Sequence, residues 1–117
     1  MADLTHRDGA LDYQAFWLRY LRAHAKPETR ALHYCGSLLA LGAVVLAIAS
    51  GEWLWLIAAP LLGYGFAWTA HFGVEHNRPE TFGHPFWSLM SDYRMLALFL
   101  TGRLGPHLAA AGVRPGA

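Results

Sequence analysis

Two long runs without a formally charged side chain dominate the hydrophobic pattern of this chain. The first extends from Ala31 to Ser50 and the second from Trp53 to Val74, with only Gly51 and Glu52 between them. Each run is long enough to cross a ~30 Å hydrocarbon core as a helix. The pattern therefore predicts two membrane-spanning helices joined by a tight turn.

Shorter amphipathic segments flank this predicted hairpin. From about Leu11 to Ala25, apolar residues recur at spacings of three and four, as in a helix at the membrane interface. A further helix is expected from Pro85 to about Thr101. It is one-sided and carries charge, which favours partial insertion over a third full span. The fold class is thus all-α, a helical membrane protein with a two-span hairpin and flanking amphipathic helices.

The two ends of the chain are predicted to be unstructured. Residues 1–10 are polar and should form a mobile tail. Residues 105–117 are rich in Pro, Gly and Ala and are expected to be disordered. A single helical membrane domain over residues 11–104 remains between them.

Composition supports the membrane assignment and excludes other classes. Only 15% of the residues are charged and 55% are hydrophobic, whereas soluble domains average roughly 25% charged residues. A net charge of +1 provides no broad basic surface for nucleic acid. Positive side chains flank the two runs, and the turn between the runs has none, so both termini should be cytoplasmic.

Four histidines fall where the two predicted spans approach the cytoplasmic surface. His33 lies 19 residues before Glu52 and His71 lies 19 residues after it. In an antiparallel helical hairpin such positions lie at the same depth. His24 precedes the first run and His84 follows the second. All four can therefore meet in one layer and form a nitrogen-rich metal site, which suits Fe, Zn, Cu or Ni.

Other polar residues surround these histidines in the sequence. Glu75 follows His71 by four residues and shares its helix face. His76 follows His71 by five and points about 140° away, so it is the weaker ligand candidate and its role stays open. Arg30 and Arg78 are expected to contact lipid headgroups, and either could pair with a substrate carboxylate.

Several short motifs together resemble the 2-hydroxy fatty acid dioxygenase family. The resemblance extends roughly from Tyr13 to Arg103. It rests on Phe16-Trp17, on His24 with Pro27, on the segment from Arg30 to Gly36, on the segment from Gly63 to Trp68 with His71, on the segment from Glu75 to Pro79, and on His84-Pro85 with Ser88-Leu89 and Asp92.

The resemblance implies an Fe(II)-dependent dioxygenase of fatty acid α-oxidation. Such an enzyme uses O2 to convert a 2-hydroxy fatty acid into an acid one carbon shorter. Carried over by position, the metal ligands would be His24, His33, His71 and His84. Glu75 and Asn77 would support the metal site or orient the substrate. The chain resembles short bacterial members, so we expect a multi-pass protein of the bacterial inner membrane, with a homo-oligomer as an option.

The residues alone are also compatible with two other functions. One is a non-catalytic membrane scaffold whose histidines form structural hydrogen bonds. The other is a zinc-dependent lipid hydrolase. A metal at the interface between helices open to lipid suits an amphiphilic substrate, with the polar head at the metal and the tail in the bilayer.

Overall fold

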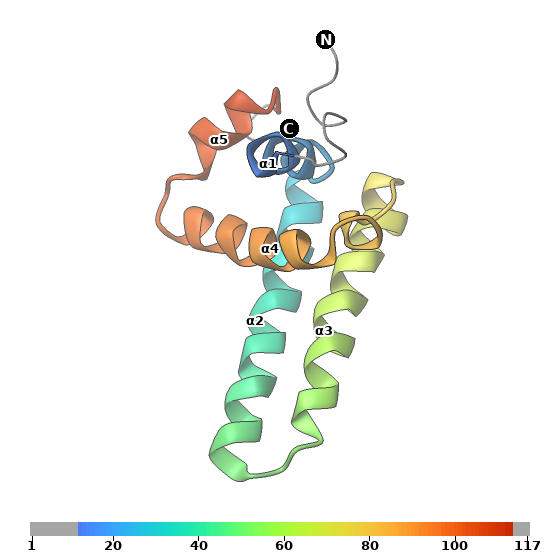
Figure 1. The fold of residues 1–117 in the computed structure, drawn as a ribbon, viewed down its shortest axis with the longest axis vertical. Helices are drawn as coiled ribbons and strands as arrows, with labels where there is room; N and C mark the ends of the chain where they lie inside the picture. Colours follow the sequence, from blue (N-terminus) through green and yellow to red (C-terminus); the bar gives the residue numbers. More distant parts are fainter. Residues whose placement is uncertain (1–11, 114–117) are drawn as a thin grey trace.

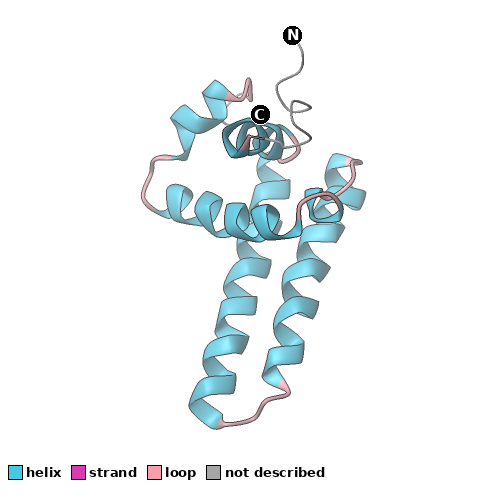
Figure 2. Cartoon of the chain, viewed as in Figure 1, coloured by secondary structure: helices cyan, strands magenta, loops and turns pink. Residues whose placement is uncertain are grey.

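All regular structure in the described part of the chain is helical. The computed structural model describes residues 12–113. These residues form helices joined by short loops (Figure 2). The predicted all-α class is therefore confirmed, whereas the predicted tail over residues 1–10 lies outside the described residues.

A long antiparallel hairpin forms the extended part of the molecule (Figure 1). Helix α2 (Pro27–Ser50) begins with Pro27 at its first position, where the missing N–H costs nothing. It ends at Gly51, whose φ of 75° is the left-handed conformation that favours glycine. Helix α3 (Trp55–Thr69) returns alongside α2 and continues into the π-helix η2 (Ala70–Glu75).

Small residues let α2 and α3 approach closely. A Cβ atom placed on Gly36 would lie 2.8 Å from Phe66 Cβ and 3.1 Å from the Gly63 carbonyl oxygen. No ordinary side chain fits at that separation. Gly36 is therefore required where the two helices touch.

A compact head sits on the open end of the hairpin. It consists of α1 (Tyr13–Arg22), α4 (Pro85–Leu100) and α5 (Leu104–Ala110), with the 3-10 helix η3 (Glu80–Phe82) leading into α4. Aromatic residues of α1 form its core together with Met95 of α4 and Leu104 and Leu108 of α5. Helix α4 crosses the hairpin instead of running along it (Figure 1).

The disordered tail predicted from residue 105 onward is wrong for residues 105–113. Leu104 and Leu108 are one helical turn apart and are both buried, and Ala111 and Val113 are buried after them. These four apolar side chains belong to the core cluster formed with α1, and this packing stabilises α5. Residues 114–117 lie outside the described part of the chain.

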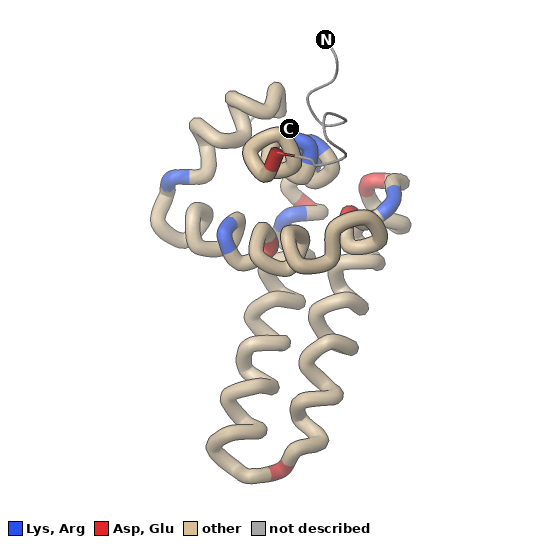
Figure 3. The backbone as a smooth tube through the Cα atoms, in the orientation of Figure 1, with Lys and Arg blue, Asp and Glu red and all other residues tan. Residues whose placement is uncertain are grey.

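The second membrane span is not confirmed. Within residues 12–113, α2 is the one helix that is long and apolar enough to cross a membrane. The second apolar run is divided, because α3 has 15 residues and the chain then widens into η2. Charged residues gather at the head end and at the turn, where Glu52 lies, and the hairpin between them has none (Figure 3).

Candidate metal centre

Three buried histidines meet where the hairpin joins the head. His24 follows the end of α1, His33 lies in α2 and His71 lies in η2. His33 Nε2 is 3.0 Å from His24 Nε2 and 3.2 Å from His71 Nε2. Three imidazoles thus turn the same nitrogen toward one point, and their ligand atoms lie close enough together to hold one metal ion. We call these residues the histidine triad.

Arg30 fixes the loop that carries His24. Its Nη1 donates to the carbonyl oxygen of His24 at 2.8 Å and to that of Ala25 at 2.9 Å. Arg30 is itself buried. The sequence suggested a substrate-binding role for this residue, but the structure places its guanidinium group on the protein backbone.

The π-helix brings Asn77 back to His71. The Asn77 backbone N–H donates to the His71 carbonyl oxygen at 2.9 Å, and the left-handed His76 makes the turn between them with a φ of 61°. Single π-turns are frequent at functional sites because they re-aim the following residues. Here the widened turn places the Asn77 side chain beside the His71 ring.

Each histidine of the triad has a partner for its outer nitrogen, Nδ1. His24 Nδ1 is 2.6 Å from the Tyr20 carbonyl oxygen, and His71 Nδ1 is 2.7 Å from Asn77 Oδ1. His33 Nδ1 lies 3.4 Å from Asp92 Oδ1. Such outer contacts orient metal-binding histidines and select their tautomer.

These outer partners assign the protons of His24 and His71. A carbonyl oxygen only accepts, so His24 Nδ1 must carry the proton. The Asn77 amide is oriented because its Nδ2 donates to the Ala23 carbonyl oxygen at 3.0 Å, which leaves Oδ1 to accept from His71. In neutral rings the inner Nε2 atoms of both residues then present lone pairs. Converging lone pairs are what a divalent cation requires, so the residues fit a metal ion.

Burial shifts the pKa values of several groups around the triad. The pKa of His24 is held well below its ordinary value by burial and by the nearby His33 and His71. His24 is therefore neutral at physiological pH. Burial also raises the pKa of Asp92 to about 6. The Tyr20 hydroxyl donates to Asp92 Oδ1, and burial raises the pKa of this tyrosine well above its usual range.

His84 lies outside the triad, contrary to its predicted role as a ligand. Its ring stacks on Trp87, with the centroids 5.1 Å apart, and meets the edge of Phe16 at 5.4 Å. The reason is the η3 turn, which separates His84 from His71 and delivers it to the start of α4. The structure thus shows His84 packed among aromatic rings.

The remaining predicted site residues occupy three different environments. Glu75 accepts from the Lys26 backbone N–H at 2.5 Å and from Thr29 Oγ1 at 2.9 Å, so it caps the first turn of α2. Arg78 is exposed, and its guanidinium lies 5.0 Å from the centroid of the Phe82 ring. His76 is exposed as well. Of the predicted supporting residues, only Asn77 contacts the triad directly.

Asp92 and Tyr20 were not identified as site residues from the sequence. Asp92 is the single acid within α4, the segment predicted to be a one-sided, partly inserted helix. A single acid in a largely apolar helix was the available signal, because such a group usually has a specific partner. Tyr20 fits the apolar spacing of the segment from Leu11 to Ala25, and its hydroxyl partner is 72 residues away in the sequence, so the pattern alone does not mark it as a site residue.

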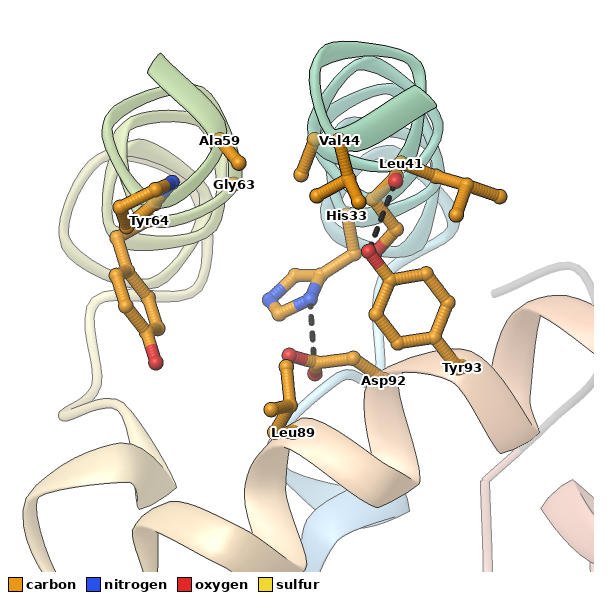
Figure 4. Close-up of a pocket in the computed structure, with 12 residues that line it drawn as sticks. His33, Leu41, Val44, Ala59, Gly63, Tyr64, Leu89, Asp92 and Tyr93 are labelled. Atoms are coloured by element: carbon orange, nitrogen blue, oxygen red, sulfur yellow. Dashed lines mark hydrogen bonds and ion pairs between the residues drawn. The ribbon is translucent and has the colours of Figure 1, made fainter. Parts of the chain in front are cut away.

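A cavity of about 380 Å³ opens beside the triad. His33 and Asp92 lie at one end of it, and α4 also contributes Tyr93 (Figure 4). Val44 of α2 and Ala59 of α3 face the space between the two helices farther along. A polar end beside potential metal ligands and a long apolar remainder suit an amphiphilic ligand.

Comparison with known proteins gives one assignment. No curated protein and no solved structure matches the chain significantly. A family match, however, covers residues 10–104 and so contains all three histidines of the triad, Asn77 and Asp92. The chain belongs to the Mpo1-like family, which is described as 2-hydroxy-palmitic acid dioxygenase Mpo1-like.

Proposed function

We propose that this protein is an iron(II)-dependent dioxygenase that shortens a 2-hydroxy fatty acid by one carbon. The observation that carries this proposal is the histidine triad, whose three Nε2 atoms converge and whose His33 also lines an apolar cavity. The family to which the chain belongs supplies the reaction class. The triad supplies a place where a metal ion could be held.

His24, His33 and His71 would hold the metal ion. Bound iron(II) would supply redox chemistry with O2 and open positions for ligands, which zinc cannot match because it has no redox chemistry. Three protein ligands leave room for the substrate. Iron is therefore the metal that fits the family's reaction class.

The protein's own residues position this centre and receive the substrate. Asn77, the Tyr20 carbonyl group and Asp92 hold the three rings with their Nε2 atoms inward. The cavity beside the triad has no Lys or Arg in its lining. The carboxylate and hydroxyl groups of the substrate would consequently lie at the triad, where a bound metal ion would supply positive charge.

We further propose that the hairpin spans the bacterial inner membrane twice, with both termini cytoplasmic. Only 28% of the most apolar stretch of α2 is buried, whereas the core helix of a soluble protein is mostly buried. Large apolar side chains cover the outside of the hairpin; Ile48 is 72% exposed and Leu61 is 70% exposed. Exposure of this apolar surface to water is unfavourable, whereas the acyl chains of lipids would cover it.

Isotope-labelled substrate tests the proposed reaction. The reaction balances if the acid and one O2 yield the shortened acid, one CO2 and one water. Purified, iron-loaded protein is given O2 and 2-hydroxyhexadecanoate carrying carbon-13 in its carboxyl group. We expect labelled CO2, pentadecanoate and O2 uptake in equal amounts, and loss of all three in His71→Ala.

The same assay separates the two alternatives. A zinc-dependent hydrolase would release no CO2 and consume no O2, and it would bind zinc in preference to iron. A structural scaffold would leave the substrate intact and retain its fold without bound metal. Either result would contradict the proposed function.

A further inference from the structure

The cavity beside the triad is lined by three helices, α2, α3 and α4. Val44 of α2 faces Ala59 and Gly63 of α3, and Leu89, Asp92 and Tyr93 of α4 complete the lining (Figure 4). Tyr93 Oη donates to the Ser37 carbonyl oxygen at 3.0 Å, which ties α4 to α2 at that end. The cavity therefore has one fixed polar end and extends away from it between the helices.

Small side chains keep this space open. A Cβ atom on Gly63 would be 3.5 Å from Ala40 Cβ, which is an ordinary van der Waals contact. The two helices are therefore close here but not tightly packed. Ala59 adds another small side chain on the α3 side. Larger residues at these positions would fill the volume that the helices leave.

The length of the cavity fits a long acyl chain. His33 and Val44 are eleven residues apart in α2, which corresponds to about 16 Å at ~1.5 Å per residue. An extended chain of single bonds advances roughly 1.2 Å per bond, as the ~3.5 Å span of three backbone bonds indicates. The distance from His33 to Val44 thus accommodates about 14 bonds of an extended chain.

We propose that this cavity binds the acyl chain of the substrate and that Val44, at its far end, limits the chain length. This inference rests on the proposed function for its reaction, but the acyl site is a separate claim about the structure. The occupant is a fatty acid and not a bilayer phospholipid, because the polar end leads to the histidine triad and its lining has no Lys or Arg to bind a phosphate.

A matched pair of substitutions tests the acyl site. Val44→Trp fills the far end of the cavity, whereas Val45→Trp adds the same side chain at a neighbouring position that is 54% exposed and does not line the cavity. We expect Val44→Trp to lower kcat/KM for 2-hydroxyhexadecanoate, relative to 2-hydroxydecanoate, by about tenfold or more. Excluding two methylene groups at about 0.8 kcal/mol each accounts for that factor. Val45→Trp should leave the ratio unchanged.

A smaller side chain tests the same claim in the opposite direction and does not depend on the tryptophan variant folding. Val44→Ala should shift the preference toward acids longer than sixteen carbons. If the wild type, Val44→Trp and Val44→Ala share one chain-length preference, Val44 does not limit the acyl chain and the proposal is overturned.

Binding without turnover separates this proposal from the proposed function. The affinities of hexadecanoate and decanoate, which lack the 2-hydroxyl group, are measured by displacement of a fluorescent fatty acid in detergent. If Val44→Trp selectively weakens hexadecanoate while no protein turns over any 2-hydroxy acid, the acyl site stands and the dioxygenase assignment fails. If turnover occurs, but Val44→Trp changes neither turnover nor binding in a way that depends on chain length, only the acyl-site proposal is overturned.

Discussion

The outward-facing nitrogen of each histidine in the triad determines what the inward-facing nitrogen can do. Asn77 illustrates this best, because its amide is held at both ends. Its Nδ2 donates to the Ala23 carbonyl oxygen, and its Oδ1 accepts from His71 Nδ1. One side chain thus links the loop that carries His24 to the ring of His71.

Removing this link should weaken metal binding. We expect Asn77→Ala to raise the Kd for iron(II) about 10–100-fold, the usual effect of losing an outer partner of a metal-binding histidine. Isothermal titration under anaerobic conditions measures it. The control is His76→Asn, an exposed neighbour at which Asn tolerates the left-handed backbone. Equal affinities in the two variants would show that Asn77 does not support the site.

Asp92 gives the metal-free protein a pH-dependent stability. Burial raises the pKa of Asp92 from 3.8 to about 6, so the folded state holds this proton more tightly than the unfolded state. The stabilising contribution is complete below about pH 4 and is lost as the pH rises through about 6, by an amount on the order of 3 kcal/mol. The titration of Asp92 therefore adds a pH dependence to the free energy of unfolding that a neutral residue at this position lacks.

Comparison with Asp92→Asn isolates this contribution. Between pH 4 and pH 6, the Tm of the metal-free wild type should fall relative to the Tm of metal-free Asp92→Asn. Above pH 6 the difference between the two Tm values should stay constant. Thermal unfolding followed by circular dichroism in detergent measures it. A difference that is flat across this range would mean that Asp92 titrates as an ordinary surface acid.

The sequence was informative about some residues of the site and silent about others. The equal distances of His33 and His71 from the turn predicted that they would meet, because a helical hairpin converts sequence position into depth. No such rule covers Asp92, since its place depends on how α4 crosses the hairpin. The prediction for His84 failed because the η3 turn, whose direction the sequence pattern does not reveal, redirects the chain before α4.

Among the elements, the contact between α2 and α3 sets the geometry of the whole site. His33 and His71 belong to opposite arms of the hairpin, so the separation of the arms determines the separation of the two rings. Gly36 lies three residues beyond His33, at the point of closest approach to Phe66. A change in the spacing of α2 and α3 at Gly36 should therefore change the distances between the rings of the triad.

Gly36→Ala should destabilise the hairpin and disturb the triad. The added methyl group would lie 2.8 Å from Phe66 Cβ, and overpacking of this kind costs roughly 1–3 kcal/mol. The measurements are Tm and iron(II) affinity, both of which should fall. In the control, Gly42→Ala, the new Cβ meets nothing within 4 Å. There the better helix propensity of Ala should stabilise the protein by up to about 1 kcal/mol. Similar effects at both positions would argue against a close helix contact.

Sequence patterns predicted the long elements better than the short ones. The uncharged run that became α2 is clear from its length alone. Helix α5 was missed because Gly105, Pro106 and several alanines hide the one-turn spacing of Leu104 and Leu108. The change from α3 to η2 leaves no mark in the hydrophobic pattern, because the uncharged run continues across it to Val74.

The whole molecule combines a polar head with an apolar hairpin. Its principal extents are 52 × 34 × 27 Å, and the charges lie at the head end and at the Glu52 turn (Figure 3). In the proposed orientation the head lies at the cytoplasmic surface and the turn reaches the opposite side. The triad is then at the level of the lipid headgroups, within reach of an acid whose tail stays in the bilayer.

Cysteine labelling tests this orientation. Cys35 is the one cysteine of the chain and is replaced by Ala. Single cysteines are then placed at two exposed positions, by Glu52→Cys in the turn and Ala109→Cys in α5. An impermeant maleimide should label Glu52→Cys in intact bacteria and Ala109→Cys only after permeabilisation. Labelling of both positions in intact cells, or of neither, would contradict a two-span hairpin with a cytoplasmic head.

The most direct test of the three-histidine site is the iron content of four single variants, measured by elemental analysis after anaerobic loading and desalting. His24→Ala, His33→Ala and His71→Ala each remove one inner nitrogen of the triad, whereas His84→Ala removes a ring that packs on Trp87. We predict one iron per chain in the wild type and in His84→Ala, and a loss to less than about a tenth in each triad variant. A wild type that binds no iron, a triad variant that keeps its iron, or a loss in His84→Ala alone would contradict the three-histidine site.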